Sequence, residues 1–89
     1  MDDNVYQLDP SSATWLVVEG EVVVLGDGNV RYMAVNGAGA AVWPDLERGV
    51  TLPQMSRRLQ DDFGIDEATA TRDAQSFVDE LRTRNLLRD

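Results

Sequence analysis

The sequence predicts an α+β domain in which a three-stranded antiparallel sheet is followed by three helices. In the first half of the chain, short runs of β-branched residues are separated by glycine-containing turns. In the second half, apolar residues recur at intervals of three and four, with capping residues between the runs. We therefore expect one domain over residues 13–89, preceded by a flexible N-terminal segment over residues 1–12 that lacks periodicity.

Three runs are predicted to form the strands. The first two, residues 15–18 and 22–25, are separated by three residues in which Gly20 supplies the positive φ of a hairpin turn. Residues 26–29 form a second turn signal, Gly-Asp-Gly-Asn, and residues 30–35 read as the third strand. The sheet is then a meander.

The first helix is predicted to begin after Asn36 as the N-cap and to end near Gly49. Pro44 removes a backbone donor and crowds the preceding turn, so the helix is expected to kink or restart there. The adjacent Gly37-Ala38-Gly39 lacks the third glycine and the parallel strands of a dinucleotide-binding loop. Close packing of the helix is the better interpretation of these small residues.

The second and third helices have clearer boundaries. Thr51 and Gln54 fit a capping box, and Gly64 marks the end of the second helix. Asp66 and Glu67 place acids at the positive end of the third helix, which is predicted to end near Asn85. The two apolar stripes are Leu52, Met55, Leu59 and Phe63, and then Ala70, Ala74, Phe77, Val78 and Leu81.

Composition disfavours several classes of function. Eight basic and 16 acidic residues give a net charge of −8, which makes nucleic acid and anionic membranes poor partners. The chain has no Cys and no His, so thiolate catalysis, serine relays and ordinary zinc or haem sites are excluded. Paired carboxylates such as Asp61-Asp62 read as surface charge. We expect a cytoplasmic protein that is not an enzyme and has no cofactor, metal or membrane segment.

The third predicted strand stands out because little protects it from pairing with another chain. Natural edge strands commonly carry Lys, Pro or a bulge, whereas here only Arg31 interrupts an otherwise apolar run. If this strand is an edge, it is a template on which a peptide can add as a fourth strand. A central position in the sheet, or cover by a helix, is equally compatible with the pattern.

The order and spacing of these features resemble a known family. They are a strand, an Asn, a run of small residues, Trp43, a Gly-Xaa-Thr helix start and a final helix with Asp73, Phe77 and Leu81. This arrangement, from about Trp15 to Leu87, is similar to the PqqD-like precursor-peptide recognition element of pathways that make peptide natural products on the ribosome. Pro44 departs from the uninterrupted helix that is usual in that family.

The resemblance implies a winged helix-turn-helix-like fold without catalytic activity. Such domains bind the leader of a ribosomal precursor peptide as a strand beside strand three and against helix three. A chain of this kind looks most like the lasso-peptide version, whose partners are a separate leader peptidase, a cysteine protease, and a macrolactam cyclase. Carried over to this sequence, the peptide-binding residues are Val30, Arg31, Tyr32, Met33, Ala34, Val35, Asp73 and Phe77.

Two other functions compete with leader binding. A winged-helix DNA-binding transcriptional regulator shares the architecture, but its recognition helix should carry cations, whereas Glu67, Asp73, Asp79 and Glu80 lie on the third helix here. An acyl carrier shares the size and acidity, but its Asp-Ser-Leu attachment site does not occur in this sequence. Acidic side chains near the binding site would favour a leader with basic residues.

Overall fold

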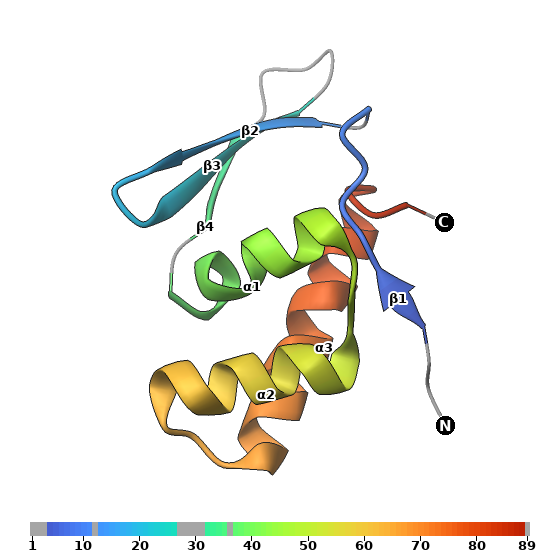
Figure 1. Ribbon diagram of the computed structural model, residues 1–89. Helices are drawn as coiled ribbons and strands as arrows, with labels where there is room; N and C mark the ends of the chain where they lie inside the picture. Colours follow the sequence, from blue (N-terminus) through green and yellow to red (C-terminus); the bar gives the residue numbers. More distant parts are fainter. Residues whose placement is uncertain (1–3, 12, 27–31, 36, 89) are drawn as a thin grey trace.

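The predicted order of a sheet followed by three helices is confirmed by a computed structural model, which describes residues 4–11, 13–26, 32–35 and 37–88 (Figure 1). The three-stranded sheet is antiparallel with the order β2-β3-β4, and β1 pairs with β5 in a second, two-stranded sheet. The elements are β1 (Val5–Tyr6), β2 (Ala13–Val18), β3 (Glu21–Gly26), β4 (Tyr32–Val35), α1 (Gly37–Arg48), β5 (Val50–Thr51), α2 (Leu52–Phe63) and α3 (Glu67–Thr83).

The β2–β3 hairpin forms where the sequence predicted it. Glu19 and Gly20 have φ values of 50° and 81°, so both turn residues are left-handed, as in the two-residue turns that match strand twist. Val18 pairs with Glu21 next to the turn, and the ladder continues to Ala13 opposite Gly26. The predicted turn at residues 27–29 and the predicted cap at Asn36 lie outside the described residues.

The helices cover one face of the sheet and leave the other exposed (Figure 1). On the covered face, Val22, Val24 and Val35 are buried, whereas Leu16 and Leu25 on the other face are exposed. Helix side chains complete the core, and the fully or almost fully buried ones among them are Val42, Trp43, Leu46, Met55, Leu59, Ala70, Ala74, Val78 and Leu81.

Helix α1 is one continuous helix through Pro44, so it does not restart at that residue as one of the two predicted outcomes required. Trp43 and Leu46 on either side of the proline are completely buried, whereas Pro44 itself is exposed. Packing of the flanking side chains therefore holds the helical path although proline supplies no N–H to it. Gly49, with φ of 100°, follows the end of the helix as predicted.

Both predicted caps of α2 are present. The Thr51 hydroxyl accepts a hydrogen bond from the Gln54 N–H at 3.3 Å, and the Gln54 side chain accepts one from the Thr51 N–H at 2.9 Å. Gly64 ends the helix in the left-handed conformation, with φ of 65°. Phe63 belongs to the apolar stripe that was predicted to face the core. In the structure it is 48% exposed and does not join the core.

Helix α3 begins at the predicted N-cap, where the Asp66 carboxylate accepts a hydrogen bond from the Thr69 N–H at 2.7 Å. This hydrogen bond holds the pKa of Asp66 below its ordinary value. Within the described ranges, no helix combines the length and apolar character needed to cross a membrane.

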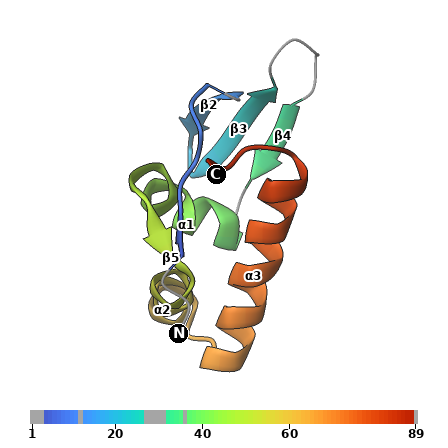
Figure 2. The same ribbon diagram turned by 90° about the vertical axis from the view of Figure 1, so that its right-hand side faces the viewer.

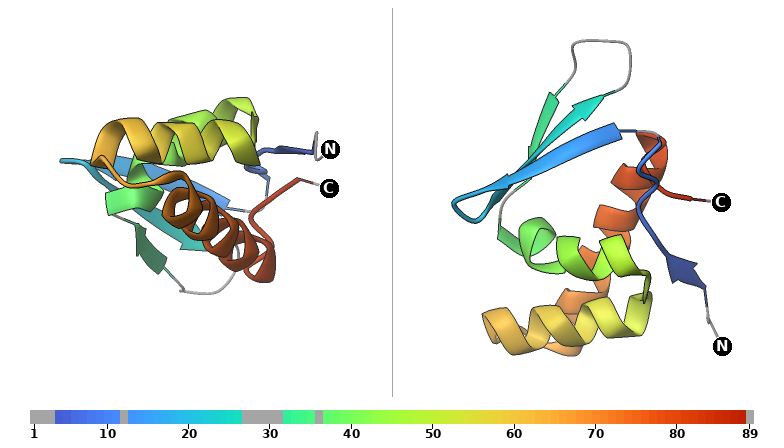
Figure 3. Two further views of the ribbon diagram at one scale, coloured as in Figure 1. Left: turned by 90° about the horizontal axis from the view of Figure 1, so that it is seen from below. Right: turned by 45° about the horizontal axis from the view of Figure 1, so that its top comes forward.

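The segment before β2 differs from the expectation that ordered structure begins near residue 13. Val5 and Tyr6 pair with β5, and Leu8 is 2% exposed in the core. The Leu8 N–H donates to the Leu46 carbonyl at 2.9 Å, and Leu8 also bridges to Leu87. Residues 4–9 therefore run across the ends of α1 and α3, beside the last residues of the chain (Figure 3).

Candidate functional site

The third strand of the meander, β4, lies at an edge of the sheet. It pairs with β3 along one side, and it lies on the α3 side of the sheet (Figure 2). Among the described residues, no strand pairs with its other side. For the described residues, the sheet order thus rules out a central position for β4, which was one of the alternatives that the sequence left open.

Strand register determines which residues of β4 present backbone groups to the free edge. The two-residue turn closes on a hydrogen-bonded pair, Val18 with Glu21, so alternate residues of β3 point toward β2 and the others toward β4. Val22 and Val24 point toward β4 and lie opposite Val35 and Met33. The N–H and C=O groups of the intervening residues, Tyr32 and Ala34, consequently face away from the sheet.

Phe77 of α3 and Val35 of β4 meet at a glycine of α1. A Cβ placed on Gly39 would lie 2.6 Å from Val35 Cγ1 and 2.9 Å from Phe77 Cε1. Only glycine therefore fits between the two side chains, which confirms that the small residues after strand three serve close packing. The centroids of the Phe77 and Trp43 rings are 6.4 Å apart, so Trp43 backs the Phe77 ring.

The flank of α3 that faces β4 follows from its contacts. The Thr71 hydroxyl lies 3.0 Å from that of Ser56 on α2, so this side of α3 faces α2. Phe77 faces α1 and β4 instead, and Asp73 lies four residues before it on the same flank. The Asp73 side chain is 44% exposed, and its carboxylate lies 3.8 Å from Arg72 Nε.

The predicted site residues are therefore brought together only in part. Val35 and Phe77 converge at Gly39, and Asp73 shares the Phe77 flank of α3, whereas the exposed Ala34 lies opposite Val23. Of the other predicted residues, Tyr32 and Met33 are described as β4 backbone alone, and Val30 and Arg31 lie outside the described residues. Gly39 and Trp43 were not predicted to shape the site, although the Gly-Ala-Gly spacing indicated close packing.

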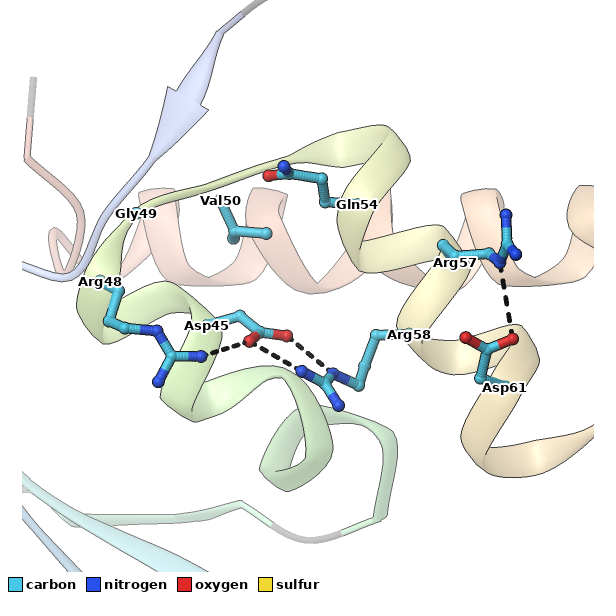
Figure 4. Close-up of a pocket in the computed structure, with 8 residues that line it drawn as sticks. All are labelled: Asp45, Arg48, Gly49, Val50, Gln54, Arg57, Arg58 and Asp61. Carbon is cyan, nitrogen blue, oxygen red and sulfur yellow. Dashed lines mark hydrogen bonds and ion pairs between the residues drawn. The ribbon is translucent and has the colours of Figure 1, made fainter.

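A polar cavity of about 440 Å³ lies on another part of the surface, between α1, β5 and α2 (Figure 4). Its centre is Asp45, which receives hydrogen bonds from Arg58 Nε at 2.9 Å, from Arg58 Nη2 at 3.1 Å and from Arg48 Nη2 at 2.9 Å. Arg57 and Asp61 pair at the rim at 3.5 Å. The guanidinium groups already have carboxylate partners from this chain, so the cavity is best explained as an ion-pair clamp between α1 and α2.

Hydrogen bonds from Arg58, aided by the charges of Arg58 and Arg48, hold the pKa of Asp45 below its ordinary value, although burial opposes them. The ion pairs of Asp45 therefore stabilise the folded state fully above the unfolded-state pKa of Asp45. This stabilisation is lost as pH falls through the folded-state pKa of Asp45. We expect Arg58→Gln to lower the free energy of unfolding at pH 7 by more than Arg57→Gln does. Urea titrations across the acid range should show this difference closing; a pH-independent difference would contradict the assignment.

The charges on α3 bear on the DNA-binding alternative. Arg72 and Arg82 each lie 3.8 Å from a carboxylate, that of Asp73 and that of Asp79. Arg84, just after the helix, lies 3.4 Å from Glu80. No cation of α3 is thus left without an acidic neighbour, which gives phosphate binding no support. Among the described residues, no group of three or more acidic side chains is arranged to hold a metal ion.

Comparison with known proteins places these features in context. Residues 21–87 match the family model described as "Coenzyme PQQ synthesis protein D (PqqD)". Among solved structures, the chain is similar to "TbiB1 in Complex with the TbiA(beta) Leader Peptide", with a TM-score of 0.81 and 22% sequence identity over 91% of this chain and 93% of that one. No curated protein matches the sequence. The structural likeness supports the fold, and the family match covers α1, α2, α3, β3 and β4.

Proposed function

The chain belongs to the PqqD family, and from this premise we propose that it is a non-catalytic module that binds the leader of a ribosomal precursor peptide. The observation that carries the proposal is the edge of β4 on the α3 side of the sheet, with which no other described strand pairs. An extended peptide adds to such an edge through main-chain hydrogen bonds, which require little of its sequence. The similar protein TbiB1, which is described as bound to a leader peptide, supports the same type of ligand.

In the proposed complex, the leader pairs with the outward backbone groups of Tyr32 and Ala34. The half-buried Phe77, held against Gly39 and backed by Trp43, forms an apolar wall for one leader side chain. Because a disordered leader loses conformational entropy on binding, we expect dissociation constants of about 1 μM.

The finer part of the proposal concerns the pathway. The sequence resemblance to lasso-type recognition elements supports a role in lasso-peptide biosynthesis. The bound leader would be presented to a separate leader peptidase, a cysteine protease, and to a macrolactam cyclase. Purified chain should then accelerate leader removal by its cognate leader peptidase; an unchanged cleavage rate would rule out this role without contradicting leader binding.

Substitution of Phe77 tests the proposed pocket. We expect Phe77→Ala to weaken leader binding by about 1–3 kcal/mol, because the apolar wall is lost. The probe is a fluorescein-labelled synthetic leader, chosen from candidate precursor peptides by its binding to the wild-type chain, and it is titrated by fluorescence anisotropy. The matched control is Phe63→Ala, since Phe63 is the last residue of α2 and is 48% exposed.

Phe77 also packs against the core, so thermal melting accompanies each titration. If Phe77→Ala is partly unfolded at the assay temperature, Phe77→Leu supplies a smaller truncation of the same wall. Equal affinities of wild type, a folded Phe77 variant and Phe63→Ala would exclude Phe77 from the binding site.

A further inference from the structure

One carboxylate on the flank of α3 that faces β4, beside the proposed peptide-binding site, has only a distant ion-pair partner among the described residues. Among the described residues, the cation nearest to Asp73 lies 3.8 Å away, on the adjacent Arg72, whose own side chain is 76% exposed. Glu80, three residues after Phe77, is instead paired with Arg84 at 3.4 Å. Asp73 is thus the acid on this flank that is best able to accept a new cationic partner.

The spacing along α3 matches the spacing along an extended peptide. Asp73 and Phe77 are four residues apart, which is about 6 Å of helix rise. Side chains on one face of a strand, at positions i and i+2, are about 6.7 Å apart. A strand that packs one side chain against Phe77 therefore brings the side chain two positions away to the level of Asp73.

The relative direction of β4 and α3 determines the order in which a bound peptide would reach Phe77 and Asp73. β4 ends at Val35, next to Phe77, and α3 runs from there away from the sheet toward its N-terminus (Figure 2). A peptide paired with Ala34 that continues past Val35 meets Phe77 first and Asp73 next. The leader residue at the Asp73 level therefore lies beyond the end of β4, where side-chain contacts to α3 replace backbone pairing.

We propose that Asp73 selects leaders that carry a basic residue two positions from the apolar residue packed against Phe77. The inference rests on the proposed function and specifies its ligand as an extended peptide with the pattern apolar, any residue, basic. The net charge of −8 acts in the same direction, because it attracts a basic peptide before contact is made.

The expected contribution is modest because Asp73 is partly exposed to solvent. Exposed ion pairs change dissociation constants by about two- to fivefold, and salt weakens them. Association of a basic leader should also slow as ionic strength rises, since steering by the net charge is screened.

Selection from random peptides tests the inference, because it does not depend on which precursor the chain binds. The probe is a displayed library of random 15-residue peptides, selected on immobilised full-length chain at low ionic strength and then sequenced. Wild type should enrich Lys or Arg two positions from an apolar residue. Asp73→Lys should instead enrich Asp or Glu at that position.

Asp79→Lys is the matched control. It changes the net charge equally on the same helix, but Asp79 lies two residues after Phe77 and so points about 200° around the helix from it. This control should retain the wild-type pattern. Individual peptides with Lys or Gln at the selected position should differ about two- to fivefold in affinity for wild type and not for Asp73→Asn.

The outcomes separate the inference from the proposed function. Strand-like binders that depend on the β4 edge but show no charge preference at this position would overturn the role of Asp73 and leave leader binding intact. If Asp73→Lys and Asp79→Lys change the charge preference of the selected peptides equally, the preference reflects net charge alone, and the role of Asp73 is also overturned. Selected peptides that bind the Ala34→Pro variant, in which the β4 edge is blocked, as well as they bind wild type would contradict the proposed function itself.

Discussion

Ala34→Pro is expected to abolish leader binding while leaving the fold intact. The Ala34 N–H faces the free edge of β4, so proline removes a donor that a leader needs and breaks no bond to β3. Its side chain is exposed, which leaves room for the proline ring. Anisotropy titration with the labelled leader should show affinity lowered at least about 100-fold, or roughly 3 kcal/mol, with circular dichroism close to that of wild type.

Two further proline variants sharpen this test. Val17 lies on the opposite edge of the sheet, where the same alternation turns its N–H outward, so Val17→Pro should leave leader binding unchanged. Met33 points its N–H toward Val24, so Met33→Pro should disturb the sheet itself and lower the melting temperature. Undiminished binding by a folded Ala34→Pro variant would exclude strand addition at β4.

Leu8→Ala is expected to lower the free energy of unfolding by about 2–5 kcal/mol. Leu8 is 2% exposed, and the lost methyl groups would leave a cavity between the ends of α1 and α3. A domain of this size has a total stability of only about 4–13 kcal/mol, so this change is large. Urea denaturation followed by tryptophan fluorescence measures it.

Val5→Ala provides the comparison for Leu8→Ala. Val5 belongs to the same segment but is 63% exposed, so its truncation should cost no more than about 0.5 kcal/mol. If the two variants unfold at the same urea concentration as wild type, residues 4–9 do not contribute to the folded core.

The elements that were predicted correctly have local signals in the sequence. Glu19-Gly20 between two β-branched runs defines a two-residue hairpin, because its turn needs positive φ. The Thr51 capping box and the Gly64 end of α2 depend on side-chain and backbone chemistry within a few residues. Such short-range signals are sufficient to place an element and its ends.

The N-terminal segment and the path of α1 could not be predicted in this way. β1 and β5 contain two residues each, which is too short for an alternating pattern, and their pairing joins segments more than 40 residues apart. Continuity of α1 through Pro44 depends on the burial of Trp43 and Leu46, which is decided by tertiary packing. Phe63 fits the apolar spacing of α2, yet it lies at the end of the helix and remains half exposed.

The candidate site, like the fold, could be predicted only where the signal lies within a few neighbouring residues. The unprotected composition of strand three is compatible with an edge, but only the order β2-β3-β4 shows that it is one. The residues of β4 that face outward, Tyr32 and Ala34, follow from the register between β3 and β4, and no two-residue turn signal in the sequence fixes that register. The contact of Val35 and Phe77 at Gly39 joins three separate elements and has no signal in any one of them.

The completely buried Trp43 gives the protein an optical sensor for the proposed peptide-binding site between β4 and α3. Its indole is shielded from water and lies against Phe77, with the ring of Trp15 on another side at 5.6 Å, edge-on. A chain with Trp15→Phe would retain Trp43 as its single emitting indole. Any ligand that moves Phe77 should then change the emission of Trp43, so occupancy of the proposed site can be followed without a label on either molecule.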